Sequence, residues 1–377
     1  GGPAPFVNAV VTYVGSVLRT GNLAYVSGPP YRYLVDFMIV APAVTATALM
    51  AAPLLLVQRR AGLRELVPAA VLVTLLLLVT NSALTKTLRY VMAVEVGMRI
   101  LAAAGAAAGL ATAFNAPIAG GVFVLEELVK RFDPRTTVAT LVASASGFMA
   151  AYPFVHSGSE FQVPPLADPQ LGGSGWVLAV GVLTGVLGVL YNKAIMFSLR
   201  TADTSGWPVE VRAALIGATV GVLVWYSPDL AGGGDHLTQE ALLGHGAIGA
   251  VTAVLVLRFV LGVVSYAAGT PGGLFAPMLV LGADVGLIVG LIAAHVAPHS
   301  APSPAALALI GMAAFFTASV QAPVTGLILA TELTGSTNQL PPMLGACATA
   351  LLVAIALGSR PIYDLLTDRA STSAATS

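Results

Sequence analysis

The sequence has 377 residues, of which 57% are apolar and only 9% are charged, with 17 basic and 17 acidic residues. An ordinary soluble domain carries roughly 25% charged residues, so a soluble globular protein is excluded because it would have too few charges to cover its surface. The balanced charge excludes a basic nucleic-acid surface, and the high hydrophobicity excludes a disordered chain. We therefore expect a polytopic membrane protein.

Long apolar runs follow one another along most of the chain. A helix needs about 20 apolar residues to cross a bilayer core of ~30 Å. The predicted spans are 33–58, 66–84, 97–113, 136–153, 177–198, 210–227, 247–268, 303–320 and 342–358. Shorter apolar segments lie at 117–128, 274–297 and 323–333, and small residues are expected to interrupt 274–297. Because lipid offers no hydrogen bonds to the backbone, all of these segments are predicted to be helices, and no alternating barrel pattern is present.

Several short segments begin with proline after a small or polar residue, at 115–117, 276–277 and 321–323. Proline is well tolerated in the first turn of a helix and poorly tolerated in its middle. These positions therefore predict that one helix ends and another begins at membrane depth. Such breaks occur inside protein or beside a wet cavity, and in transporters they are typical of ion sites.

An internal repeat links two of these breaks. Residues 115–120 read NAPIAG and are followed by Glu126, and residues 321–326 read QAPVTG and are followed by Glu332. The proline, the glycine and the glutamate keep the same spacing in both copies. Short apolar helices can resemble one another by chance, but the coincidence of all three residues favours a duplicated architecture.

The strongest local pattern is AGTPGGLFAP at 268–277, in which three glycines and two prolines interrupt a span. The first amides of the helix that resumes after it lack internal partners and carry the positive end of the helix dipole. Gly272 and Gly273 allow an ion to approach the backbone closely. The pattern indicates an anion site, and the alternative is a plain loop between two spans.

The segment 268–277 resembles the Gly-x-Phe-x-Pro filter of the CLC family of chloride channels and proton-coupled chloride transporters. Further similarities follow in the order of the family, at 105–117, 125–128, 231–234, 311–323, 332–334 and 360–363. The resemblance covers about 97–367. It implies an all-α polytopic membrane protein, built as a CLC-like inverted-repeat bundle with broken and re-entrant helices.

The resemblance also implies a division of the chain. We expect poorly matched membrane segments at 1–96, first-half helices at 97–230, second-half helices with the anion filter at 231–367, and a frayed tail at 368–377.

The resemblance implies a chloride site. The backbone N–H groups of Leu274 and Phe275 would hold the ion, and the hydroxyl of Tyr363 would donate a further hydrogen bond. Without its neighbours Arg360 and Pro361, Tyr363 would more readily be interpreted as an interfacial anchor. The residues expected to support the filter are Gly272, Gly273 and Pro277.

Two adjacent glutamates end the first-half repeat. Glu127 falls at the position of the family's inner proton-transfer glutamate, and Glu126 matches a partly structural neighbour. The simpler alternative is a solvated pair of carboxylates at a helix end, near Lys130 and Arg131. Glu332 is expected to be structural.

Two anion-binding motifs of the family, Gly-Ser-Gly-Ile-Pro and Gly-Arg/Lys-Glu-Gly-Pro, are not found, and residues 1–96 match poorly. Three explanations stay open: part of the natural chain is omitted or rearranged, the protein is a divergent member with a different outer pore, or it no longer conducts. The external gating glutamate and the pore serine are therefore not assigned.

The function expected from this resemblance is transmembrane chloride transport, as a channel or as a chloride/proton antiporter. The sequence does not decide between the two, nor does it set anion selectivity or voltage dependence. The expected partners are chloride, protons, lipid and a second copy of the chain, with residues 118–125 and 341–358 contributing to a homodimer. We expect a multi-pass protein of a bacterial inner or plasma membrane, with no cofactor, metal site, enzymatic activity or nucleic-acid partner. The alternative function is a non-conducting membrane scaffold or regulatory subunit.

Overall fold

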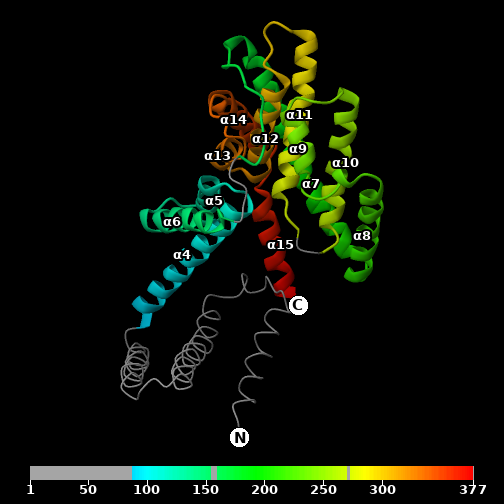
Figure 1. The fold of residues 1–377 in the computed structure, drawn as a ribbon. Helices are drawn as coiled ribbons and strands as arrows, with labels where there is room; N and C mark the ends of the chain where they lie inside the picture. Colours follow the sequence, from blue (N-terminus) through cyan, green and yellow to red (C-terminus); the bar gives the residue numbers. More distant parts are fainter. Residues whose placement is uncertain (1–86, 154–158, 270–271, 377) are drawn as a thin grey trace, which may run out of the picture. The chain divides into compact units, whose positions relative to one another are not determined.

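The computed structural model describes residues 87–153, 159–269 and 272–376. The predicted spans 33–58 and 66–84 lie outside the described residues. Within them every regular element is a helix, and residues Arg99–Leu366 form one compact unit. The α-helices, coloured along the chain in Figure 1, are α4 (Thr87–Ala113), α5 (Pro117–Phe123), α6 (Pro134–Ala151), α7 (Ser174–Thr204), α8 (Val209–Tyr226), α9 (Asp235–Leu242), α10 (Ile248–Tyr266), α11 (Phe275–Val296), α12 (Pro304–Val320), α13 (Pro323–Thr334), α14 (Leu340–Ala356) and α15 (Ile362–Thr376).

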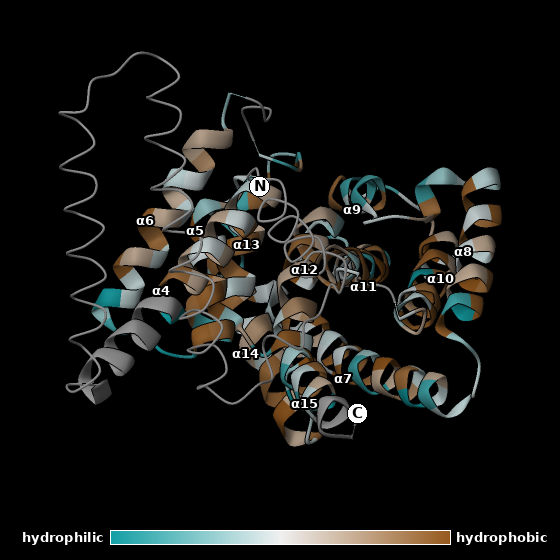
Figure 2. Cartoon of the chain, turned by 90° about the horizontal axis from the view of Figure 1, so that it is seen from below, coloured by the Kyte–Doolittle hydropathy of each residue, from teal (hydrophilic) through white to brown (hydrophobic). Residues whose placement is uncertain are grey.

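The predicted helical spans from 97–113 onward are confirmed, because each corresponds to one helix. Their ends are shifted by at most six residues, except that α4 begins at Thr87, ten residues before the predicted start. Four helical segments are long and apolar enough to cross a membrane, at Leu171–Thr204, Val209–Tyr226, Ile248–Tyr266 and Phe275–Val296. Hydrophobic colours predominate along α11 and α12 in Figure 2, whereas the short α9 is largely hydrophilic. The composition and the helices together make this an integral, multi-pass membrane protein.

Helix α12 forms the centre of the compact unit. Every residue from Ala305 to Val320 is buried, and the helix packs against α7, α11 and α14. A helix that is hydrophobic on all sides is covered on all sides, which explains why this span shows no polar face. The core around α12 is the frame on which the candidate site is built.

The expectation that small residues interrupt the segment 274–297 is wrong, because α11 runs without a break from Phe275 to Val296. Its glycines serve close helix packing instead. A Cβ atom on Gly282 would lie 2.5 Å from the carbonyl oxygen of Gly311, and one on Gly290 would lie 2.5 Å from the Cα atom of Pro304. Small residues at regular spacing let two membrane helices approach at backbone distance, so these glycines fix the contact between α11 and α12.

The two copies of the repeat share one backbone conformation. Asn115 and Gln321 both adopt a left-handed conformation, with φ of 51° and 62°. The next residues, Ala116 and Ala322, have φ/ψ of −133°/81° and −117°/80°. A proline then starts α5 and α13 in the same way. The repeat predicted from the sequence is therefore present as a structural repeat of helix end, break and new helix.

Candidate functional site

The predicted filter segment lies at the beginning of α11, immediately after Gly272 and Gly273. Leu274 occupies the N-cap position and Phe275 is the first helical residue, and their exposed fractions are 3% and 8%. The backbone N–H groups of these two residues donate no hydrogen bond to any residue that the structure describes. Buried N–H groups are almost always paired, so two donors that have no partner among the described residues, at a buried helix start, indicate an electron-rich ligand.

A cluster of aromatic rings surrounds this helix start and brings distant segments together. The ring of Phe275 lies 4.3 Å from that of Phe114 and 4.7 Å from that of Phe316, measured between centroids. The ring of Phe123, at the end of α5, lies 5.6 Å from Phe275 and 5.8 Å from Tyr363. Phe123 therefore bridges the filter segment and the predicted pore tyrosine, which the sequence separates by 88 residues.

The segment just before Tyr363 is held by side-chain amides. The Asn192 amide donates to the carbonyl oxygens of Ser319 (2.9 Å) and Arg360 (3.3 Å). The Gln321 amide donates to the carbonyl oxygen of Ser359 (2.8 Å). These bonds tie the turn before α15 to α7 and to the second repeat break, so the start of α15 has a fixed position in the compact unit.

An ion pair holds the other side of the same helix start. Lys130, in a left-handed conformation after the π-helix Val124–Val129, lies 2.6 Å from the carboxylate of Asp364. Both side chains are partly exposed, so the pair adds at most about 1 kcal/mol to stability. The pair matters for position rather than for stability, because it links the end of the π-helix that carries Glu127 to the residue that follows Tyr363.

Glu127 lies in that π-helix, and its exposed fraction is only 5%. Its Oε1 atom has no hydrogen-bond partner among the described residues. The charged groups that act on it are Lys130, Asp364 and Glu126. π-turns are rare and are frequent at functional sites. The alternative of a solvated glutamate pair does not describe Glu127, which is buried.

Glu126 and Glu332 form what we call the reciprocal caps. The Glu332 carboxylate accepts hydrogen bonds from the backbone N–H groups of Ile118 (2.9 Å) and Ala119 (2.6 Å), at the start of α5. The Glu126 carboxylate accepts from the N–H groups of Val324 (3.1 Å) and Thr325 (2.7 Å), at the start of α13. Each repeat thus supplies a carboxylate that accepts hydrogen bonds from the first backbone N–H groups of the other repeat's helix. The residue at each N-cap is an alanine, whose side chain cannot accept these bonds.

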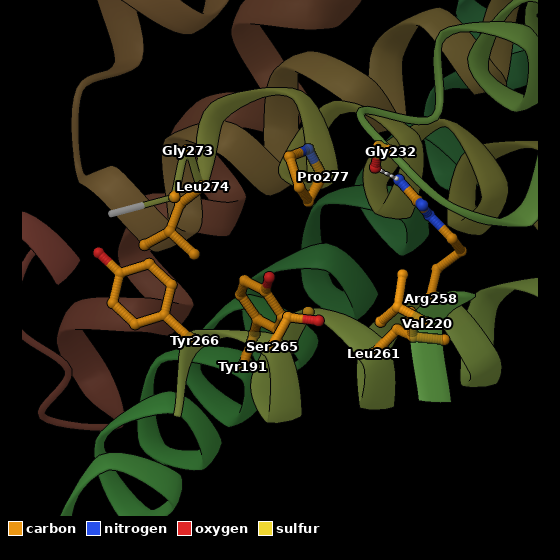
Figure 3. Close-up of a pocket in the computed structure, with 12 residues that line it drawn as sticks. Tyr191, Val220, Gly232, Arg258, Leu261, Ser265, Tyr266, Gly273, Leu274 and Pro277 are labelled. Carbon is orange, nitrogen blue, oxygen red and sulfur yellow. Dashed lines mark hydrogen bonds between the residues drawn. The ribbon is translucent and has the colours of Figure 1, made fainter. Parts of the chain in front are cut away.

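The residues expected to support the filter, Gly272, Gly273 and Pro277, line a pocket of about 260 Å³ between α7, α8, α10 and the start of α11. Figure 3 shows this pocket with Arg258 on one side and Leu274 on the other. Phe275 and Tyr363 do not line it. The filter segment therefore faces two environments, the aromatic cluster and this pocket.

Two charged side chains inside apolar helices were missed by the sequence analysis. Arg258 in α10 is buried and donates to the carbonyl oxygens of Leu230 (3.2 Å), Gly232 (3.0 Å) and Gly233 (2.7 Å). Asp284 in α11 is 3% exposed, and its Oδ2 atom has no partner among the described residues. The sequence could have revealed both, because each is an ionisable residue within an apolar run, and such a residue in a membrane span is a candidate functional residue by default. The described residues contain no group of three or more His, Cys, Asp or Glu suited to a metal ion.

Comparison with known proteins identifies a family for this chain. Residues 79–355 match the family model described as voltage gated chloride channel. The chain belongs to the voltage gated chloride channel family. The resemblance to the CLC family that the motifs predict is therefore confirmed, and the break before α11 lies within the matched region.

Two similar relatives are H(+)/Cl(-) exchange transporters named ClcA. The protein of Vibrio parahaemolyticus is 34% identical over 278 residues, and that of Vibrio cholerae is 35% identical over 275 residues. Each match covers 71% of this chain and 59% of the relative. The chain thus spans about three fifths of the length of the curated relatives it matches.

Solved structures share the fold. A slow cyanobacterial Cl-/H+ antiporter is 30% identical, with a TM-score of 0.68, and the match covers 72% of this chain and 65% of that one. A eukaryotic CLC transporter matches with a TM-score of 0.57 at 22% identity, over 70% of this chain and 45% of that one. The second likeness shows the fold alone. An all-α, CLC-like bundle with broken helices is thereby confirmed.

Proposed function

We propose that this protein transports chloride across a bacterial inner membrane. The observation that carries the proposal is the pair of N–H groups at Leu274 and Phe275, buried where α11 begins and without a hydrogen-bond partner among the described residues. Neutral donors suit a transported anion, because a directly contacting cation would hold it too tightly to leave. Tyr363, one aromatic ring away from Phe275, would supply a hydroxyl donor to the same ion.

We propose antiport with protons rather than passive conductance. The relatives that the chain matches at 34–35% identity are exchange transporters by name. Glu127 supports this mechanism, because a buried carboxylate with one oxygen that has no partner among the described residues is suited to bind and release a proton. In this proposal Glu127 delivers protons from the inner side, and Gly272, Gly273 and Pro277 support the filter.

Chloride binding by the purified protein tests the anion site. Tyr363→Phe removes one hydroxyl donor and keeps the ring against Phe123. A hydrogen bond to a charged partner contributes about 1.5–3 kcal/mol, so calorimetry should show chloride affinity weakened by roughly tenfold or more. Tyr226→Phe, which removes an exposed hydroxyl on α8, is the matched control. Equal chloride affinity in Tyr363→Phe and Tyr226→Phe would remove Tyr363 from the site.

A liposome flux assay with simultaneous pH recording tests the coupling. Wild-type protein should move protons in fixed proportion to chloride, and Glu127→Gln should lose proton movement while chloride flux persists, since the amide cannot carry a proton. Glu160→Gln, at an exposed position, controls for loss of a carboxylate. Chloride flux without protons in the wild type would identify a channel, and anion leak equal to that of empty liposomes would identify a non-conducting subunit.

We further propose a homodimer that buries apolar side chains of α5, α13 and α14. Ile118, Val324 and Leu344 are 55%, 46% and 57% exposed, and Leu352 and Ile355 of α14 are 66% and 58% exposed. Of the predicted interface segments 118–125 and 341–358, Ile118 and the exposed side chains of α14 would take part, whereas most of 119–125 is buried within the chain itself. Lipid would cover the apolar helices elsewhere. The division at residues 230/231 into two halves stays a prediction.

A further inference from the structure

The pocket in Figure 3 has chemistry that the proposed transport path does not use. Its volume is about 260 Å³, and its lining residues include Tyr191, Ser265, Tyr266 and Arg258. Figure 3 shows the hydroxyl oxygens of Tyr191 and Ser265 near its centre. The backbone at Gly273 and Leu274 closes one side. Hydroxyl and guanidinium groups are hydrogen-bond donors, so the polar part of this lining is suited to an anion.

The hydroxyl of Tyr191 is the decisive feature. Tyr191 is completely buried, and its hydroxyl has no hydrogen-bond partner among the described residues. Its ring is fixed by edge contacts with Phe259 (5.2 Å) and Phe315 (5.9 Å), so the hydroxyl cannot swing away to another partner. In Figure 3 the oxygens of Tyr191 and Ser265 lie in the central part of the view, between Tyr266 and Arg258. A buried polar group without a partner requires an explanation.

Helix α10 has a glycine where it passes the Tyr191 hydroxyl. A Cβ atom at position 262 would lie 2.5 Å from the Tyr191 hydroxyl oxygen, closer than any real contact. Gly262 is therefore the residue that leaves space for the hydroxyl beside the pocket. With Ser265 one turn further along α10, the helix presents a recess and a donor on the same side.

Arg258 supplies positive charge to the pocket. Its three hydrogen bonds to the carbonyl oxygens of Leu230, Gly232 and Gly233 fix the guanidinium group, which Figure 3 shows turned toward Gly232 at the edge of the pocket. Its acidic neighbours are Asp235 and Asp284, whose carboxylates offset that charge. The pocket therefore has no large excess of positive charge, a balance that suits a weakly held monovalent anion better than a phosphate.

We propose that this pocket is a second binding site for a small monovalent anion, held by the hydroxyl groups of Tyr191 and Ser265 beside Arg258. Chloride is the natural ligand if the proposed transport function holds. The site is adjacent to the filter rather than within it, because Gly272, Gly273 and Leu274 line the pocket whereas Phe275 and Tyr363 do not. An anion here would contact the Gly273–Leu274 backbone that leads into the filter.

Crystals of the full chain grown in sodium bromide, measured at the bromine absorption edge, test this inference. We expect anomalous density in the pocket beside Tyr191 in addition to density beside Leu274 and Phe275. In Tyr191→Phe, which keeps the ring and its packing, loss of one donor should lower bromide affinity at the pocket by roughly tenfold. The pocket density should therefore disappear at a bromide concentration that still fills the filter. Tyr226→Phe should change neither density.

The outcomes separate this inference from the proposed function. Bromide beside Leu274 and Phe275 alone overturns the second site and leaves the transport proposal intact. Bromide in the pocket alone supports the second site and contradicts the proposed filter. Pocket density that persists unchanged in Tyr191→Phe overturns the inference, because it rests on that hydroxyl. Gly262→Ala gives an independent check, since its methyl group would crowd the hydroxyl and should also remove the pocket density.

Discussion

The reciprocal caps lead to a quantitative prediction about stability. Glu332 accepts two backbone hydrogen bonds at the start of α5, with N···O distances of 2.9 and 2.6 Å. Hydrogen bonds to a charged group contribute about 1.5–3 kcal/mol each, and the caps are partly exposed, so the lower figure applies. Glu332→Ala should therefore reduce the free energy of unfolding by about 3 kcal/mol. Glu332→Gln keeps one oxygen acceptor without the charge and should cost about half as much.

The symmetry of the repeat extends this prediction to the other copy. Glu126 accepts from two backbone N–H groups at the start of α13 and also from the hydroxyl of Thr325 (2.7 Å). Glu126→Ala should destabilise the protein at least as much as Glu332→Ala. Thr325→Val removes only the hydroxyl bond to this carboxylate and should cost about 1.5 kcal/mol.

Thermal unfolding of the detergent-purified protein, followed by tryptophan fluorescence, provides the measurement. A loss of 1 kcal/mol lowers the midpoint by about 2–4 °C in a domain of 150–250 residues, so Glu332→Ala should unfold several degrees below the wild type. Glu160→Ala removes an exposed carboxylate and serves as the matched control. If Glu332→Ala unfolded within about 0.5 kcal/mol of Glu160→Ala, the usual range of surface substitutions, the caps would have no stabilising role and the reasoning would be refuted.

Two further predictions concern close packing and pH. Gly286→Ala places a methyl group against the carbonyl of Leu307 and should destabilise the protein by about 1–3 kcal/mol, whereas Gly217→Ala, with open space around it, should be neutral or stabilising in the same thermal assay. Hydrogen bonds from Thr136 hold the pKa of Asp133 below its ordinary value, so its cap on α6 stabilises the fold above pH ~4 and is lost as the pH falls through the lowered folded-state pKa. Hydrogen exchange at the start of α6 should increase at acidic pH in the wild type, and Asp133→Asn, whose amide does not titrate, should abolish that pH dependence.

The sequence predicted the helices well because membrane spans depend on composition and length alone. Runs such as 210–227 and 247–268 needed only an apolar stretch to be recognised, and they correspond to α8 and α10. The expectation of an interruption in 274–297 was wrong, because glycine can have two different effects on a helix and composition does not distinguish them. It weakens a solvated helix, but at Gly282 and Gly290 it admits a neighbouring backbone, and that contact depends on α12.

The part of the candidate site that could be predicted is the part formed by the backbone of one continuous segment. The break at 272–275 follows from the order of glycine, proline and phenylalanine, so its position was accessible from the sequence. Side chains that converge from distant segments were not. The contact of Phe123 with Tyr363, and the pocket shared by Tyr191 and Arg258, depend on how α7, α10 and α15 pack, which no local pattern encodes.

Helix α5 contacts the second repeat at its first turn and the candidate site at its last residue. Glu332 of the second repeat fixes the first turn of α5, and Phe123 at the end of that seven-residue helix touches the rings of both Phe275 and Tyr363. A helix this short has little intrinsic stability, so its position depends on its cap and its packing. Glu332 therefore does more than cap a helix. By holding α5 in place it also holds the Phe123 ring, which contacts both Phe275 and Tyr363. In the proposed chloride site, the spacing between the filter amides and the tyrosine hydroxyl depends on this cap.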